Sequence, residues 1–456
     1  MEPSPAYSLR GSVQQAMTMD GVLSPFKEQS NRDKLKKEWI SSGHIVDSPE
    51  HSTYKTSRNQ VVKMIRIARK DKSLKNCKNA KGDSKKIWRV IREANDTKPT
   101  SNTIPDFIKV QTADGSIKKI RNKTDIANEM NRRFCKMGAN LAEKLPTTDA
   151  HFSNYLPTPN PNHERFILHP TTETEVNKES QDLDPSKNIG VDDVSPKIVK
   201  WSSVLLTPIL TKLINKCFLG GIYPDRLKLA RVIPVFNGGG SKNESSLHRP
   251  ISILTQINPI FERLLRDRLY DFVKDKLYRK QFGFRPKNST EHPVLDLKEN
   301  IFENCSKKQI SCILFLDLKK AFDTVSHKIL LEKLQYYGVQ GNALNLFRSY
   351  LTNRKQQTVI GDFVSDLELI EWGVPQGSVL GPLLFLIFIN DIPHASDLGT
   401  WLFADDTSLV LSANNLCELQ TLMNYQVDRV HDWLLANRLS VHYVDKSQYM
   451  LMSSTI

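Results

Sequence analysis

The chain has 456 residues, of which 39% are hydrophobic and 25% charged, a composition typical of a globular protein with two or three domains. Lys and Arg outnumber Asp and Glu by 64 to 50, and the resulting net charge of +14 favours a polyanionic partner. The six cysteines include no CxxC pair, which argues against a zinc module and a secreted disulfide framework. We find no signal-like N-terminus and no apolar run of spanning length. We therefore expect an intracellular protein of the nucleus or cytoplasm, not secreted and without a membrane partner.

Four segments follow one another along the chain. Residues 1–33 mix Met, Ser, Pro and Gln without periodicity, so we expect them to be disordered. Residues 34–143 predict a basic, mainly helical region. Residues 144–164 are rich in Pro, Thr and Asn, which indicates a linker and the main domain boundary. Residues 165–456 have a different, strand-containing pattern.

Positive charge is concentrated near the N-terminus. Between Lys55 and Arg92 there are fourteen Lys or Arg and only two Asp, a net charge of +12. Such a run is either the solvated face of a helix or the footprint of a nucleic acid, and the run alone does not decide between them. The candidate nucleic-acid-binding residues within it are Lys63, Arg66, Arg69, Lys85, Lys86 and Arg89.

Two further elements are predicted before the linker. The stretch 107–120 has the pattern of a small hairpin that turns at Asp114-Gly115. Apolar residues then recur at helical spacing, which predicts an amphipathic helix over 124–143.

Beyond the linker, strand-like runs alternate with helical patterns. The predicted strands are 231–236, 311–317, 358–360, 367–372, 401–404 and 407–411. The predicted helices are 207–218, 259–276, 327–337, 380–392 and 416–437. This mixture is typical of an α+β domain with a partly antiparallel sheet.

Aspartates stand where predicted strands end. In WLFADDTSLVL, Asp405 and Asp406 interrupt two apolar runs, and a hairpin turn is the plain interpretation. Asp317 ends an earlier run, where it can equally be a cap or turn residue. If these strands are neighbours, however, three carboxylates converge, and oxygen ligands suit Mg²⁺. A pair of such ions about 4 Å apart is the usual device for in-line phosphoryl transfer.

A glycine-rich stretch, GVPQGSVLG, lies between the acidic runs. Gly373, Gly377 and Gly381 allow the backbone to approach a ligand closely, and Ser378 is placed to cap the following helix. An ordinary loop-to-helix junction explains the same residues. Spacing alone does not show whether Gln376 contacts a nucleotide or a template base.

Taken in order, these motifs resemble the reverse transcriptase of non-LTR (LINE-type, jockey-like) retrotransposons. The similarity spans roughly residues 165–452, with a looser likeness back to about Lys34. The blocks that resemble the family are KNIGVDDVSP (187–196), GIYPDRLKLARVIPVF (221–236), HRPISIL (248–254), QFGFRPKNSTEH (281–292), FLDLKKAFDTVSH (315–327), GVPQGSVLGPLLF (373–385), FADD (403–406) and WLLANRLSV (433–441) with Lys446-Ser447.

The resemblance implies a fold and an activity. The fold is that of right-hand polymerase fingers and palm with an antiparallel palm sheet, over residues 165–456 and ending before a thumb. The activity is RNA-directed DNA polymerisation, the two-metal transfer of a nucleotide from a dNTP to a primer 3′-hydroxyl. The implied partners are an RNA template, a DNA primer and dNTPs, and the cofactor is a pair of Mg²⁺ ions, for which Mn²⁺ can substitute.

The resemblance also implies residue roles. Asp317, Asp405 and Asp406 are the metal-binding, catalytic carboxylates, and Lys446 is the acid that protonates pyrophosphate. The nucleotide-binding residues are Arg249 at the triphosphate, Phe322 beneath the sugar, where it excludes a 2′-hydroxyl, and Gln376 with Gly377 against the nucleotide and template. Arg285 supports the template or the packing of the fingers.

Some family features are replaced or lie beyond this sequence. Asn237 stands where the family usually has a lysine that contacts phosphate, and the endonuclease and thumb of the family are not found here. A decayed fragment that retains only nucleic-acid binding is therefore the alternative to an active polymerase. A related palm polymerase, such as an intron maturase, is a more distant alternative.

Overall fold

The computed structural model describes residues 25–43, 46, 48–79, 105–111, 116–157, 164–442 and 447–454. Its contacts divide the chain into two compact units, Met1–Thr103 and Ile104–Ile456, which are described separately below.

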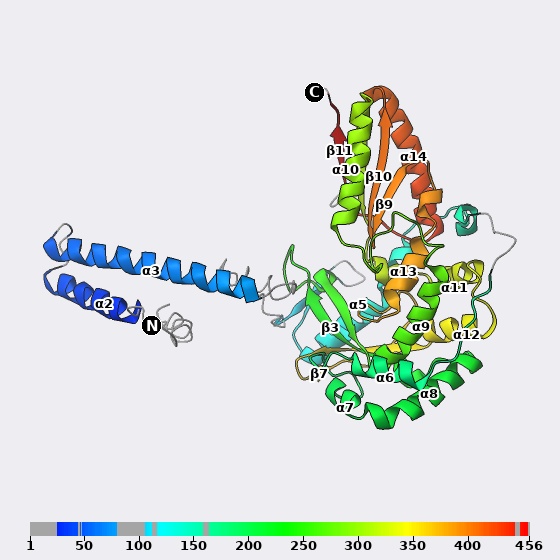
Figure 1. Ribbon diagram of the computed structural model, residues 1–456, viewed down its shortest axis with the longest axis horizontal. Helices are drawn as coiled ribbons and strands as arrows, with labels where there is room; N and C mark the ends of the chain where they lie inside the picture. The colour runs from blue at the N-terminus through cyan, green and yellow to red at the C-terminus, as the bar shows by residue number, and fades with distance from the viewer. Residues whose placement is uncertain are drawn as a thin grey trace. The chain divides into compact units, whose positions relative to one another are not determined.

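The described residues of the first unit form two helices that pack side by side, α2 (Pro25–Ser41) and α3 (Pro49–Asn79) (Figure 1). Trp39 of α2 stacks on Tyr54 of α3, with ring centroids 5.5 Å apart. The prediction of disorder over 1–33 is wrong for residues 25–33, which begin α2. This segment is rich in Lys, Glu, Gln and Arg, and these residues favour helix even without an apolar stripe.

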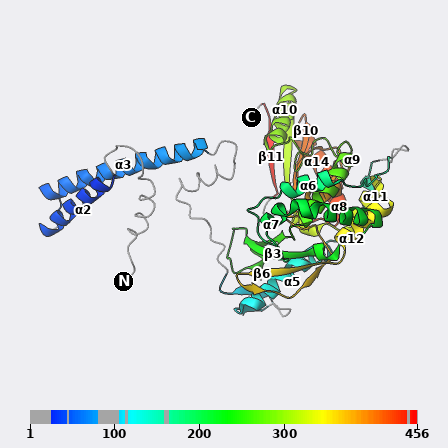
Figure 2. The ribbon, with the colours of Figure 1, turned by 60° about the horizontal axis from the view of Figure 1, so that its bottom comes forward.

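One sheet of the second unit has the order β4-β3-β6-β7, with β8 also paired to β6. Its strands are β3 (Leu229–Phe236), β4 (His248–Ile253), β6 (Arg354–Ile360), β7 (Phe363–Val364) and β8 (Glu368–Ile370). Helix α5 (Lys123–Glu143) packs on this sheet (Figure 2). Its Ile126, Met130 and Phe134 bury against Val232 and Ile360. The small hairpin of β1 (Ile108–Gln111) and β2 (Ile117–Ile120) adjoins the same cluster.

These contacts move the domain boundary. The structure divides the chain at residues 103 and 104 rather than at the predicted linker, because α5 buries its apolar face on β6, β7 and β8. Within that predicted linker, Phe152 is buried in the core, in the short helix η1 (Phe152–Tyr155). The predicted hairpin and the predicted helix over 124–143 are confirmed, whereas the turn at Asp114-Gly115 lies outside the described residues.

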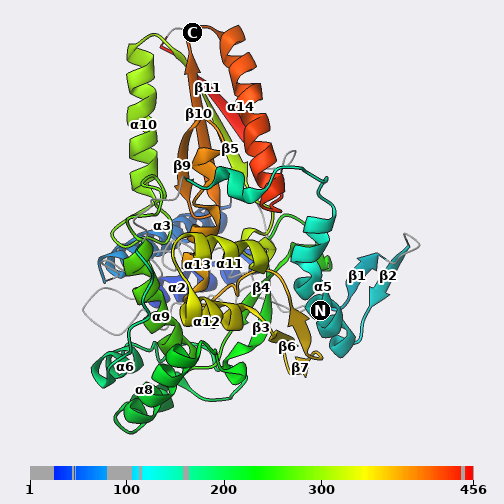
Figure 3. The same cartoon turned by 90° about the vertical axis from the view of Figure 1, so that its right-hand side faces the viewer.

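A second sheet has the order β11-β5-β10-β9, with every pair antiparallel. Its strands are β5 (Ile310–Asp317), β9 (Gly399–Phe403), β10 (Asp406–Ala413) and β11 (Gln448–Met452). Successive residues of a strand point to opposite faces. Helices α10 (Glu291–Ser306) and α14 (Leu416–Ala436) lie on opposite sides of this sheet (Figure 3). Cys312 and Leu409 therefore face the side of α14, and Ile313 and Val410 face α10.

The largest core lies among the remaining helices. These are α6 (Glu173–Gln181), α7 (Pro196–Trp201), α8 (Ser203–Gly220), α9 (Asn258–Val273), α11 (His327–Tyr336), α12 (Gly341–Leu351) and α13 (Gly381–Ile389). Helix α13 is apolar on all sides, as expected for a helix enclosed by others. The α+β class is confirmed, although α6, α7, α10, α12 and strands β4, β7 and β11 were not predicted.

Helix α8 corrects one expectation about apolar runs. By length and composition its 18 residues could cross a membrane, whereas we expected no such run. Seven of its residues are nevertheless buried in the protein: Ser203, Thr207, Leu210, Thr211, Ile214, Cys217 and Phe218.

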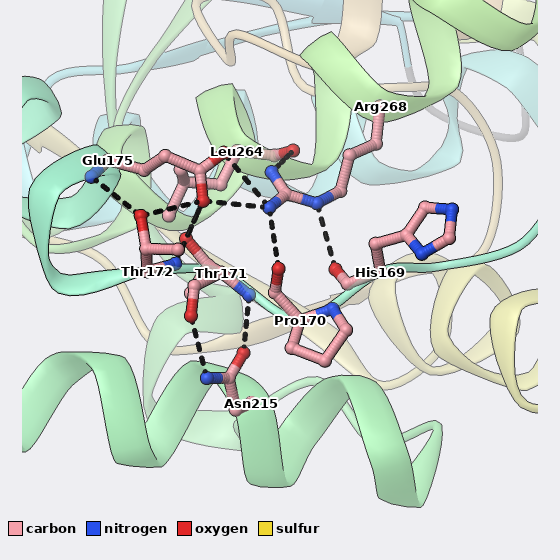
Figure 4. Close-up of polar contacts among 8 residues, drawn as sticks. All are labelled: His169, Pro170, Thr171, Thr172, Glu175, Asn215, Leu264 and Arg268. Carbon is pink, nitrogen blue, oxygen red and sulfur yellow. Dashed lines mark hydrogen bonds and ion pairs between the residues drawn. The ribbon is translucent and has the colours of Figure 1, made fainter.

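A polar cluster ties α6, α8 and α9 together (Figure 4). The Arg268 guanidinium donates to the carbonyl oxygens of His169, Leu264 and Pro170 at 2.9–3.1 Å and to the Glu175 carboxylate at 3.1 Å. In the same segment, the Asn215 side chain exchanges two hydrogen bonds with the backbone of Thr171. The Arg268 side chain is 14% exposed and that of Glu175 is 43% exposed, so the cluster lies at the border between core and surface.

We expect Arg268→Ala to lower the free energy of unfolding by about 2 kcal/mol, because several carbonyl groups and a carboxylate lose their donor together. Urea unfolding followed by circular dichroism measures the change. Arg266→Ala is the matched control, since Arg266 lies on the same helix in an exposed pair with Asp267. That variant should remain within about 0.5 kcal/mol of the wild type. Equal losses in the two variants would contradict the role of the cluster.

Candidate active site

The three predicted aspartates lie together at one end of the second sheet. The β5–β10 register places Asp317 opposite Asp406, and β9 joins β10 through the two-residue turn Ala404-Asp405. Ala404 has a φ of +58°, as a tight hairpin with a positive φ at its first turn residue requires. Asp317 and Asp405 are half-buried and Asp406 is exposed. The hairpin-turn interpretation is thus confirmed, and the register shows that the three backbone positions adjoin.

The donor set of this site is chemically suited to a hard cation, because Asp317, Asp405 and Asp406 offer oxygen atoms alone. Their side chains are not gathered into a ready-made cage, however. Within the part of the chain that the structure describes, no group of three or more His, Cys, Asp or Glu side chains is close enough to hold a metal ion. These carboxylates are therefore candidate ligands that share an edge of the sheet.

The GVPQG loop lies against β4. The Ser252 amide donates to the carbonyl oxygen of Gln376 at 2.8 Å. Gly377 has a φ of +115°, and a Cβ there would lie 2.5 Å from the Ser252 carbonyl oxygen. Only glycine fits this position. Arg249 is exposed on the same strand, and its charge acts on Asp323, the hydrogen-bond partner of the Gln376 side chain.

Phe322 lies in the short helix η4 (Ala321–Thr324), next to the same loop. Its ring stacks on Phe385 of α13, with centroids 4.8 Å apart, and meets the edge of Phe284 at 5.9 Å. The Val374 amide donates to the Phe322 carbonyl oxygen at 2.8 Å. Both the backbone and the ring of Phe322 are therefore held by neighbours, and the ring has little freedom to move aside.

Asp323 connects this helix to Gln376, whose Nε2 donates to Asp323 Oδ2 at 2.8 Å. Burial raises the pKa of Asp323 to about 6, while the charge of Lys320, the hydrogen bond from Gln376 and the charge of Arg249 act against this rise. The sequence reasoning missed Asp323, although its position directly after Phe322 was a usable signal.

We expect Asp323→Asn to change stability in a pH-dependent way. Between 3.8 and about 6, folded Asp323 keeps a proton that the unfolded chain releases, so stability falls as the pH rises. Asn cannot titrate. The free energy of unfolding of the variant minus that of the wild type should therefore increase by about 3 kcal/mol from about pH 4 to about pH 7.

Urea unfolding of both proteins at a series of pH values measures this difference. The comparison cancels other titrations, including that of His327, whose pKa burial lowers to about 4 and whose contribution to stability falls as the pH falls. A difference that stays constant with pH would contradict the prediction.

The start of helix α13 is capped by a residue that the sequence did not reveal. Glu262 of α9 is fully buried and accepts hydrogen bonds from the amides of Val379 and Leu380 and from the Tyr350 hydroxyl. Ser378 also contributes, since its hydroxyl accepts from the Gly381 amide at 3.0 Å, as predicted. A carboxylate at a helix N-terminus stabilises it through the helix dipole. The sequence feature that could have revealed Glu262 is an acidic residue at a position of α9 that faces the core.

Three other groups of predicted residues have different outcomes. The Arg285 guanidinium donates to the carbonyl oxygens of Lys274, Tyr278 and Gln281, so it supports local packing. Lys63 and Arg66 are exposed on α3. The side chain of Arg69 and the whole of Lys85, Lys86, Arg89 and Lys446 lie outside the described residues.

Comparison with known proteins identifies the class of this domain. Residues 241–456 match the protein-family model described as "Reverse transcriptase (RNA-dependent DNA polymerase)". This range contains the acidic turn, Phe322 and the GVPQG loop. The second unit thus includes a reverse transcriptase domain.

Named relatives show which reverse transcriptases the chain is similar to. The probable RNA-directed DNA polymerase from transposon BS of Drosophila melanogaster is 31% identical over 265 residues, which cover 54% of this chain and 28% of that protein. The RNA-directed DNA polymerase from mobile element jockey of Drosophila funebris is 24% identical over 427 residues, or 90% and 44% of the two chains. The Pol polyprotein from element R2DM of Drosophila melanogaster is 26% identical over 273 residues, which cover 56% of this chain and 24% of that protein.

The family match over residues 241–456 and these relatives confirm the resemblance to reverse transcriptases of non-LTR retrotransposons that the motifs indicated. The chain spans less than half the length of each of these relatives.

Proposed function

We propose that this chain supplies the polymerase centre of an RNA-directed DNA polymerase, which transfers a nucleotide from a dNTP to a DNA primer on an RNA template. The antiparallel register of β5 and β10 is the observation that carries this proposal. It sets Asp317 opposite Asp406 beside the turn that contains Asp405.

The three aspartates would hold two Mg²⁺ ions, or Mn²⁺ in their place. When bound, such ions lower the pKa of the attacking hydroxyl and neutralise the leaving pyrophosphate. Three neighbouring carboxylates repel one another, so their side chains are expected to converge only around cations. The primer hydroxyl would be positioned at this edge of the sheet.

The dNTP would lie between the acidic turn and β4. Arg249 is exposed on β4 and would donate charge-assisted hydrogen bonds to the triphosphate. Gln376 and Gly377 would pack on the nucleotide and template. Phe322 would lie beneath the sugar, and because Phe385 stacks behind its ring, the ring cannot yield to a 2′-hydroxyl.

In this arrangement the sheet β11-β5-β10-β9 with α13 and α14 is the palm. The sheet that contains β3 and β4 then belongs to the fingers. The observed antiparallel pairing of the four palm strands supports this assignment.

Primer extension tests the proposal directly. Purified chain, oligo(dT)-primed poly(rA), dTTP and Mg²⁺ should give incorporation that stops when the metal is chelated. Phe322→Ala should raise the use of UTP relative to dTTP by about tenfold or more, because loss of the ring removes a steric exclusion of 1–3 kcal/mol. No metal-dependent incorporation at high enzyme concentration would contradict a polymerase activity of this chain.

The basic helix α3 favours a second candidate function, nucleic-acid binding without polymerisation. Its Lys63 and Arg66 are exposed. If Lys63 and Arg66 contact phosphates, replacing both with Glu should weaken the salt dependence of RNA binding. The slope of log Kd against log salt concentration should then be smaller by about 2. The same charge changes at exposed Lys197 and Lys212 of the second unit are the matched control. RNA cross-linking that survives Asp405→Ala would support binding as an independent property.

A further inference from the structure

The loop formed by residues 281–285 lies between α9 and α10 in the sequence and runs along the hairpin of β9 and β10. The Phe282 amide donates to the Leu402 carbonyl oxygen at 2.8 Å, and the Leu402 amide donates to the Lys280 carbonyl oxygen at 2.9 Å. Gln281 forms a parallel bridge with Leu402. The loop thereby follows β9 toward the acidic turn.

The Gln281 side chain is 2% exposed and reaches the turn itself. Its Oε1 accepts from the Ala404 amide at 3.0 Å, and its Nε2 donates to the Ala404 carbonyl oxygen at 3.4 Å. The same Oε1 also accepts from the Gly283 amide at 2.8 Å. One carboxamide thus binds both backbone polar groups of the residue that precedes Asp405.

Ala404 is the residue of the turn that needs such support. Its φ of +58° places it in the left-handed region, which costs a residue with a Cβ about 1–2 kcal/mol. Gly283 permits the close approach, because a Cβ on Gly283 would lie 2.1 Å from the Ala404 nitrogen. The loop and the turn are therefore complementary in shape as well as in hydrogen bonding.

The loop is itself anchored on both sides of this contact. Arg285 binds three backbone carbonyl groups at its base. Phe284 has a φ of +55°, is 54% exposed and meets the Phe322 ring nearly at a right angle. A bulky residue rarely adopts this backbone conformation, and such strain is concentrated at functional sites. The loop hence contacts both the acidic turn and the ring proposed to lie beneath the sugar.

We propose that Gln281 is a positioning residue for nucleotide transfer. Its carboxamide holds Ala404 in the left-handed conformation, and this conformation keeps Asp405 at the edge shared by Asp317 and Asp406. The inference rests on the proposed polymerase function for its catalytic consequence. The bracing of the turn does not depend on that function and can be measured separately.

Gln281→Met tests the inference, because Met has nearly the same size but no hydrogen-bonding carboxamide. Hydrogen exchange of peptides that cover residues 400–408 should become at least about tenfold faster, since the Ala404 amide loses its acceptor. In primer extension, kcat should fall about tenfold to a hundredfold. The Mg²⁺ concentration for half-maximal rate should rise, while KM for dTTP changes little.

Two further variants keep the test decisive if Gln281→Met folds poorly. Gln281→Glu retains an acceptor for the Ala404 and Gly283 amides and should recover most of the amide protection. Gln426→Met is the matched control, because buried Gln426 likewise accepts a backbone hydrogen bond, from the Asp397 amide at 2.9 Å, on α14. It should leave both the exchange of residues 400–408 and the Mg²⁺ dependence unchanged.

Each outcome decides one part of the inference. Unchanged exchange in Gln281→Met would overturn the bracing of the turn. Faster exchange with unchanged Mg²⁺ dependence would overturn the positioning role, since a loss of folded enzyme alone lowers kcat without shifting the half-saturating concentration. If the wild type incorporates no dTTP, the proposed function fails, and the exchange experiment still decides whether Gln281 holds the turn.

Discussion

Asp405→Asn is expected to lower dTTP incorporation on primed poly(rA) by at least about a thousandfold, with little change in stability. The substitution removes one negative charge from the edge where Asp317 and Asp406 face each other, and leaves the turn geometry intact. Asn is a common turn residue, so the hairpin should persist. Steady-state incorporation at saturating Mg²⁺ measures the activity, and thermal unfolding measures the stability.

Asp362→Asn provides a closely matched control. Asp362 also occupies the second position of a two-residue hairpin turn, between β6 and β7, and follows Gly361 with a φ of +60°. It is exposed and belongs to the other sheet. Its replacement should leave incorporation within about twofold of the wild type, because surface substitutions of this kind have small effects. Comparable activity in the Asp405→Asn variant would contradict the assignment of the acidic turn as the catalytic site.

Lys333→Met is expected to lower the free energy of unfolding by about 3–5 kcal/mol. The Lys333 ammonium donates to Asp391 at 2.6 Å and to the Phe388 carbonyl oxygen at 2.6 Å, and the two ionic side chains are 0% and 1% exposed. Removing the cation leaves a buried carboxylate without its charge partner. Among the described residues, Asp391 Oδ2 already has no hydrogen-bond partner, so little compensation is available.

Two further variants show whether the loss of stability comes from the burial of the Lys333–Asp391 ion pair or from its short distance. Lys307→Met breaks an ion pair of the same 2.6 Å length, with Glu303, on the exposed face of α10, and should cost less than about 1 kcal/mol. The double variant Lys333→Met/Asp391→Leu should regain much of the lost stability, because no charge then stays buried alone. Urea unfolding of all four proteins gives the comparison. A single Lys333→Met variant as stable as wild type would disprove the expected cost.

The sequence predicted elements best where a pattern was local. The apolar runs on either side of Asp405-Asp406 predicted two strands and a turn, and β9 and β10 confirm them. Apolar residues at helical spacing predicted α5 correctly within one residue. Helix α10 was missed because it buries few apolar side chains: Phe302, Val294 and Leu295 are exposed, and its packing depends on Ile301 with partly buried neighbours.

The residues of the candidate site likewise divide into those that local motifs predicted and those that they did not. Asp317, Asp405, Asp406, Phe322, Gln376 and Gly377 were named from motifs, and the structure places them on neighbouring segments of one unit. Glu262, Asp323 and Gln281 were not predicted as site residues. Their roles depend on partners far along the chain: Glu262 caps a helix 117 positions away, and Gln281 binds a turn 123 positions away.

By itself, the sequence determined the resemblance to reverse transcriptases, the α+β class and the residues proposed for metal and nucleotide binding, because these depend on local patterns and motif order. Only the tertiary structure decided that Asp317 pairs with Asp406, that residues 104–143 pack with the second unit, and that Gln281 supports Ala404. The physical reason is the range of the interactions. Side-chain periodicity is set within a few residues, whereas strand register and buried hydrogen bonds are set by which distant segments exclude water together.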